Sequence, residues 1–167
     1  IKGQAEKAAD SAGRLMIAFT LGVFLILVIL SLNFSSFYQA RLIMMVIPIG
    51  IVSAILGHGI VGIPFSMFSF WGIIALVGIL VNDAVVMLDQ YNRNLKKGMN
   101  PKDAGIAAGK SRFRAIILTS LTTVAGLFPL IYLETSFQAQ FLIPMAISVA
   151  YGVLFGTLIL LFFFPPL

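Results

Sequence analysis

The sequence predicts an all-α membrane protein: a bundle of five transmembrane helices plus a short cytoplasmic surface helix. Hydrophobic residues make up 60% of the chain and charged residues only 10%, whereas a soluble domain has about 25% charged residues. The mean hydropathy is +1.06, and several apolar stretches are long enough to cross a hydrocarbon layer about 30 Å thick. We therefore expect residues 14–167 to form a transmembrane domain.

The first two spans are expected at about 15–32 and 42–56. The first is apolar around its whole circumference, which is typical of a helix with a wide lipid-facing surface. Pro48 lies inside the second span and should kink it, because proline removes a backbone donor and clashes with the preceding turn. The segment 57–71 contains several glycines and Pro64, and it predicts a turn or an interfacial re-entry.

A basic loop separates the next span from the last two. Asn100 followed by Pro101 predicts a helix start, with a capping side chain and then proline at the first helical position. A short surface helix at about 101–110 is therefore expected on the cytoplasmic side. The remaining three spans are expected at about 70–88, 113–133 and 141–164.

The distribution of positive charge predicts the topology. Seven of the eleven Lys and Arg residues lie between Tyr91 and Ile116, so this loop is cytoplasmic by the positive-inside rule. The same explanation makes a nucleic-acid partner unnecessary for a chain with a net charge of +5. With five spans, the amino terminus lies outside and the carboxyl terminus in the cytoplasm.

The composition argues against metal and cysteine chemistry. The chain has no cysteine and one histidine, His58, which excludes thiolate ligands and disulfides and disfavours a histidine metal site. We expect no cofactor, no metal and no enzymatic activity, since an intramembrane enzyme needs paired aspartates, a Ser-Lys or Ser-His pair, or metal ligands.

Two of the predicted spans carry polar residues that need a reason to be in a membrane. Asp83 would cost roughly 2.5 to 3.5 kcal/mol near the bilayer centre, and Asn82 precedes it. On the following span, Arg112 and Thr119 fall on one helical stripe, and Thr119 could hydrogen-bond Asn82 or Asp83 across the interface. This combination is typical of a proton relay. Two other interpretations stay open: the threonine hydroxyl satisfies a backbone carbonyl, or Asp83 is a snorkelling or neutral acid.

Small residues recur at helical spacing and predict close helix packing. They form stripes on the third and fourth spans and a GxxxG motif on the last. The predicted packing residues are Gly72, Ala75, Gly78, Thr122, Gly126, Gly152 and Gly156.

The segments GIIALVGILVNDAVVMLDQYN and GKSRFRAIILTSLTTVAGLFPL resemble the resistance-nodulation-cell division (RND) superfamily of efflux transporters, especially its hydrophobe and amphiphile multidrug branch. The resemblance covers nearly the whole chain. It implies that these are spans eight to twelve of a twelve-span transporter and that residues 1–13 are the tail of an extracytoplasmic porter domain or a linker. It places Asn82 where the relay lysine stands in well-known members, and it matches Arg112 and Thr119 to the relay arginine and threonine.

The resemblance also implies a function. This would be the carboxyl-terminal membrane half of a proton antiporter in the bacterial inner membrane, exporting hydrophobic or amphiphilic compounds. Its partners would be the amino-terminal half with the proton-site aspartates, two further copies in a homotrimer, a periplasmic adaptor, an outer-membrane channel and the lipid bilayer. Asp83 departs from the family, where many members have asparagine, and we hypothesise that it changes protonation during transport. The alternative is a protein-export or lipid-export machine of the same fold.

Overall fold

The structure is a computed structural model that describes residues 2–34 and 36–163. Five helical stretches are long and apolar enough to cross a membrane, which confirms the predicted fold class. The chain divides into two compact units, 1–42 and 43–167. The helices are α1 (Lys2–Phe34), α2 (Phe37–Met44), α3 (Val46–Val61), α4 (Met67–Lys96), α5 (Pro101–Tyr132) and α6 (Phe137–Phe163).

Helix α1 is continuous from the polar start of the chain into the first span. It begins at Lys2, whereas the span was expected from residue 15. Arg14 donates a hydrogen bond to Asp10 at 3.5 Å within this helix, and apolar side chains such as Leu21 and Ile29 are more than half exposed. No proline or tight turn interrupts residues 2–34, so the helix of the first span also includes the polar residues that precede it.

The second span is divided into two helices at Met45. Helix α2 ends at Met44 and α3 begins at Val46. Pro48 accounts for this break, since it has no N–H to donate to the carbonyl of Met44 and its ring crowds that group. The predicted distortion is therefore found. The predicted limits were too narrow, because α3 continues to Val61, where Gly62 caps it with a φ of 76°.

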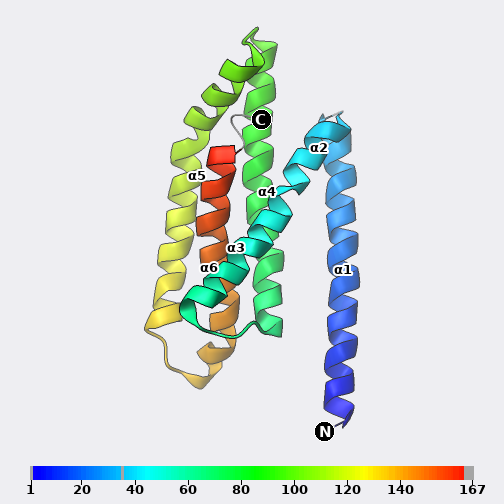
Figure 1. Cartoon of the computed structure of the whole chain (residues 1–167), viewed down its shortest axis with the longest axis vertical. Helices are drawn as coiled ribbons and strands as arrows, with labels where there is room; N and C mark the ends of the chain where they lie inside the picture. The colour runs from blue at the N-terminus through cyan, green and yellow to red at the C-terminus, as the bar shows by residue number, and fades with distance from the viewer. Residues whose placement is uncertain (1, 35, 164–167) are drawn as a thin grey trace. The chain divides into compact units, whose positions relative to one another are not determined.

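Helices α4 and α5 form an antiparallel hairpin (Figure 1). A capping box between Ser66 and Ser69 starts α4. Gly98 adopts a φ of 86° in the turn, a conformation that favours glycine. The side chain of Asn100 then accepts a hydrogen bond from the backbone N–H of Asp103 at 2.9 Å. The helix start predicted from Asn100 and the following proline is confirmed.

The prediction that the surface helix at 101–110 is separate from the following span is wrong, because α5 runs without interruption from Pro101 to Tyr132. Gly109 is the weakest helix former at the expected break, and a glycine inside a helix costs only about 1 kcal/mol. No proline follows Pro101 until Pro129, so nothing between them forces the helix to end. The basic segment is therefore the first part of the membrane helix. The last span was expected to end at Phe164, which lies outside the described residues.

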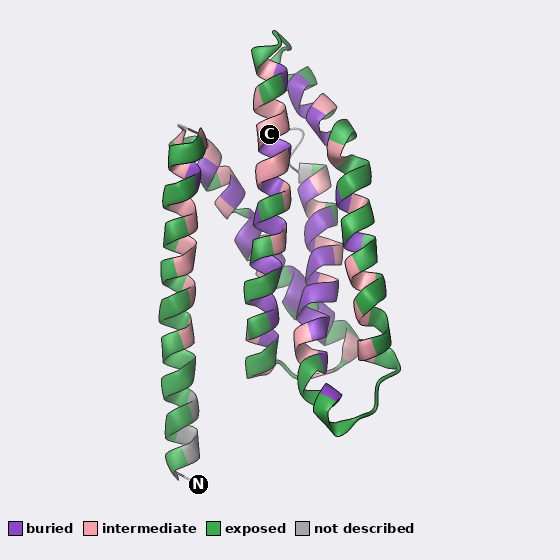
Figure 2. Ribbon diagram, turned by 180° about the vertical axis from the view of Figure 1, so that it is seen from behind, coloured by how far each residue is buried: buried purple, intermediate pink, exposed green. Residues whose placement is uncertain are grey.

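Helix α6 is the centre of the second unit and packs against α3, α4 and α5. Figure 2 shows buried residues concentrated on α6 and the helix faces beside it. The contacts are close because glycines lie opposite bulky groups. Gly57 faces Tyr151, and Gly152 faces Leu76 at distances that leave no room for a methyl group.

His58 joins α3 to α6. Its side chain is 6% exposed, and Nδ1 lies 3.0 Å from the carbonyl oxygen of Ile63, to which it donates. Nε2 lies 3.0 Å from the hydroxyl of Ser148 on α6, and the ring packs edge-on against Phe65. Both ring nitrogens are thus satisfied, and His58 has a structural role here.

We expect His58→Ala to lower the unfolding free energy of the protein by about 2 kcal/mol, because the carbonyl of Ile63 loses its donor and a cavity opens beside Phe65. The melting temperature of the detergent-purified protein measures this change. Ser148→Ala is the matched control and should cost less, since His58 keeps its bond to Ile63. Equal melting temperatures for His58→Ala and the unsubstituted protein would contradict the assignment.

Candidate functional site

The four residues predicted to form a relay lie on the two arms of the α4–α5 hairpin. Asn82 and Asp83 are in the middle of α4, and Arg112 and Thr119 are in α5. Asp83 and Arg112 are partly buried, whereas Asn82 and Thr119 are exposed in this chain. The hairpin thus places all four on neighbouring antiparallel helices.

A buried hydrogen bond near the turn fixes the register of the hairpin. Nδ2 of Asn94 donates to the carbonyl oxygen of Ala104 at 3.1 Å. Counting equal steps along both helices from this contact, Arg112 lies at about the level of Val86 and Thr119 at about the level of Ile79. Asp83 is therefore at a height between Arg112 and Thr119.

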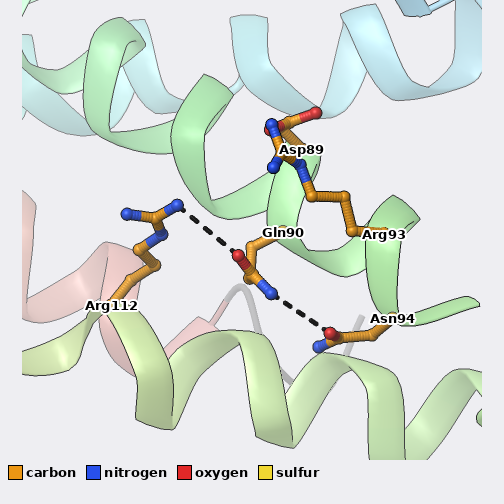
Figure 3. Close-up of polar contacts among 5 residues, drawn as sticks. All are labelled: Asp89, Gln90, Arg93, Asn94 and Arg112. Atoms are coloured by element: carbon orange, nitrogen blue, oxygen red, sulfur yellow. Dashed lines mark hydrogen bonds and ion pairs between the residues drawn. The ribbon is translucent and has the colours of Figure 1, made fainter. Parts of the chain in front are cut away.

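Arg112 is held by a chain of amide groups on α4 (Figure 3). Its Nη2 donates to Oε1 of Gln90 at 3.4 Å. Nε2 of Gln90 donates in turn to Oδ1 of Asn94 at 3.1 Å. The chain ends at the Ala104 carbonyl, so a cationic donor on α5 is connected back to the first turn of the same helix.

Two buried polar atoms in the hairpin have no hydrogen-bond partner among the described residues. They are Oδ2 of Asp83 and Nε of Arg112. One is an acceptor and the other a donor, and one lies on each arm. Buried polar groups are nearly always paired with protein or ordered water, so these atoms mark a place where water or another protein segment belongs.

The structure does not bring Thr119 into hydrogen-bond contact with Asn82 or Asp83 within the described residues. The Thr119 hydroxyl lies 3.1 Å from the carbonyl oxygen of Ala115 and 2.9 Å from that of Ile116 on its own helix. This is the backbone-satisfying arrangement that the sequence left open.

The predicted packing residues fall into two groups. Gly72, Gly152 and Gly156 are buried where helices approach closely. The other four are exposed in this chain, and a Cβ added at either glycine among them would meet nothing within 4 Å. These four are Ala75, Gly78, Thr122 and Gly126.

Several residues in this region were missed by sequence reasoning. Gln90 and Asn94 carry the amide chain, and the hydroxyls of Ser120 and Thr157 are buried 2.9 Å apart between α5 and α6. The signal for Gln90 was present, since it lies seven residues after Asp83 and therefore on the same face of α4. Among the described residues, no group of three or more His, Cys, Asp or Glu could hold a metal ion.

Comparison with known proteins gives a consistent picture. The sequence model of the AcrB/AcrD/AcrF family matches residues 1–167. An uncharacterized transporter of Haemophilus influenzae is 28% identical over 98% of this chain and 16% of its own length. The multidrug resistance protein MdtC of Pantoea ananatis is 31% identical over 96% of this chain and 15% of its own length.

Another relative is the swarming motility protein SwrC of Bacillus subtilis, which is 27% identical over 77% of this chain and 12% of its own length. The crystal structure of a heavy metal efflux pump superimposes with a TM-score of 0.85, at 24% identity, over 96% of this chain and 16% of that one. The structural match shows the fold. The chain spans no more than about one sixth of the length of these relatives.

Proposed function

The chain belongs to the AcrB/AcrD/AcrF family of RND transporters, and from this premise we propose that it is the carboxyl-terminal membrane half of a proton-driven efflux transporter. It would export hydrophobic or amphiphilic compounds by proton antiport. Asn82, Asp83, Arg112 and Thr119 would contribute part of the proton relay. Since the family consists of transporters, we assign no enzymatic reaction to the chain.

The observation that carries this proposal is the pair of unpartnered buried atoms, Oδ2 of Asp83 and Nε of Arg112. Helical side chains lean toward the amino end of their helix. Asp83 therefore leans away from the hairpin turn, toward the level of Thr119, while Thr119 leans toward the turn. A guanidinium, a carboxyl group and a hydroxyl at successive heights support a path for protons, because intramembrane ionisable groups commonly mark such paths.

The exposed face of the α4–α5 hairpin carries polar groups that favour contact with a partner. Asn82, Thr119 and Thr122 present amide and hydroxyl groups outside the core of the second unit. Polar groups are costly against lipid and favour contact with another helix. We propose that the amino-terminal half of the transporter, with its proton-site aspartates, covers this face. A homotrimer with a periplasmic adaptor and an outer-membrane channel would complete the assembly.

The location of positive charge supports the orientation that we propose for the chain in the bacterial inner membrane. The hairpin turn and the adjoining ends of α4 and α5 carry Arg93, Lys96, Lys97 and Lys102, so we place this turn in the cytoplasm. The amino terminus would then be periplasmic and the carboxyl terminus cytoplasmic. Residues 1–13 would connect to a periplasmic porter domain.

The experiment is Asp83→Asn in the complete transporter. We expect proton-driven efflux to fall by at least about tenfold, because asparagine cannot exchange a proton and a positioned proton-transfer group commonly contributes 10²-fold or more. Efflux is measured in everted membrane vesicles energised with a pH gradient, using ethidium or Nile red, whichever the unsubstituted transporter exports.

The matched control is Asp89→Asn on the same helix. Asp89 forms an ion pair with Arg93 at 2.9 Å, and both side chains are about half exposed or more, so its loss should change efflux little. If Asp83→Asn left proton-coupled efflux unchanged, the titration of Asp83 would be disproved.

A further inference from the structure

Arg112 has a long, flexible side chain, so its usefulness in a relay depends on what holds the guanidinium. Side chains lean toward the amino end of their own helix. On the antiparallel hairpin this directs Arg112 toward the turn and Gln90 away from it. The two side chains therefore meet between their helices, with Nη2 of Arg112 3.4 Å from Oε1 of Gln90.

The orientation of the Gln90 amide is fixed by what lies behind it. The Ala104 carbonyl can only accept, so Asn94 must direct its NH₂ group there. Asn94 is 5% exposed and then presents only its oxygen to Gln90. Gln90 must donate its own NH₂ group to that oxygen, which leaves the Gln90 oxygen facing α5. A guanidinium has donors but no acceptor, so this is the orientation that can bind Arg112.

We propose that Gln90 is a positioning residue for Arg112, with its amide oriented by Asn94 and the Ala104 carbonyl. This inference rests on the proposed relay role of Arg112. The contact of 3.4 Å is longer than an ordinary N–H···O hydrogen bond of about 2.9 to 3.0 Å. Gln90 therefore directs the guanidinium through a long hydrogen bond.

The contact also links the relay to the cytoplasmic turn. The chain of hydrogen bonds begins at Arg112 and ends at the carbonyl of Ala104, which lies in the first turn of α5. A change in the spacing of α4 and α5 at the turn would break the Asn94 bond first and release the Gln90 amide to rotate. The position of Arg112 would then follow the packing of the hairpin.

The test uses the complete transporter with Gln90→Met and Gln90→Glu. Methionine has a similar length and volume but cannot accept the arginine bond. Glutamate keeps an acceptor for Arg112 while losing the donor to Asn94. We expect Gln90→Met to lower proton-driven efflux of ethidium or Nile red about threefold to tenfold and to shift its pH profile. Gln90→Glu should recover most of the rate.

One mutant background and one control variant separate positioning from a general structural effect. In the Arg112→Ala background, Gln90→Met should cause no further loss, because the group that it positions is gone. Arg93→Gln removes an exposed ion pair on the same helix and should leave the rate and the pH profile unchanged. Immunoblots of the membranes verify equal amounts of each variant.

The outcomes distinguish this proposal from the proposed function. Normal rate and pH profile in Gln90→Met, with loss of efflux in Arg112→Ala, would overturn the positioning role and leave the relay intact. An equal loss from Gln90→Met with and without Arg112 would also overturn it, since the effect would then be structural. Full efflux in both Arg112→Ala and Asp83→Asn would disprove the relay itself.

Discussion

Replacing Gly72 with valine is expected to prevent α4 from docking against α6. A Cβ at this position would lie 2.5 Å from the carbonyl oxygen of Met145 and 2.8 Å from Cβ of Ser148. A backbone carbonyl cannot rotate away as a side chain can, so the two helices must separate. We expect a loss of at least about 3 kcal/mol in unfolding free energy, at the upper end for overpacking. Protein amounts in the membrane and the melting temperature in detergent measure the effect.

Gly78 provides the matched control on the same helix. Its added Cβ would meet nothing within 4 Å in this chain. Gly72→Ala should therefore lower the melting temperature clearly, whereas Gly78→Ala should leave it unchanged or raise it slightly, since alanine is the better helix former. Equal melting temperatures for the two alanine variants would show that the approach of α4 to α6 at Gly72 is looser than the structure describes.

The number of stretches able to cross a membrane could be predicted from the sequence, but the ends of the helices could not. Hydropathy reports which residues suit the hydrocarbon layer, and that layer ends before helical hydrogen bonding does. Helix α4 consequently continues past Leu88 to Lys96. The start of α5 was the exception. Asn100 identifies it because its side chain caps the first turn of the helix, whatever the surrounding solvent.

The packing faces were only partly predictable for a related reason. Spacing identifies which small residues share a face, but not which face lies opposite a partner. Gly72 is buried against α6, while Gly78 on the same helix is exposed. The decisive information is the position of α6, which comes from contacts more than 70 residues away along the chain.

The candidate site was likewise only partly predictable from the sequence. Asp83 stood out from sequence because a carboxyl group is rare inside a span. Gln90 and Asn94 did not stand out, because polar residues near a basic turn are ordinary. Their importance comes from the antiparallel pairing that brings Gln90 to Arg112, and only the structure reveals that pairing.

Arg112→Ala is expected to reduce proton-driven efflux in the complete transporter roughly 100-fold, which is the lower end of what removal of one preorganised charge-stabilising donor costs. Arg112 lies at the level between Asp83 and the turn, and its buried Nε has no partner among the described residues. Removing the guanidinium takes the fixed positive charge from this position. Efflux in energised everted vesicles measures the loss, and Arg112→Lys should give an intermediate rate because it keeps the charge but not the planar donors.

Arg114→Gln makes this prediction specific to the site. Arg114 lies two residues along the same helix, is exposed, and makes no ion pair or hydrogen bond with the described residues. Both substitutions remove one positive charge from the basic segment at the start of α5, so any change in membrane insertion through the positive-inside rule should be similar in the two variants. A difference in efflux between them therefore reports the position of the charge relative to Asp83 and Gln90. If Arg114→Gln reduced efflux as much as Arg112→Ala, the overall charge of the loop would be the cause, and Arg112 would have no relay role of its own.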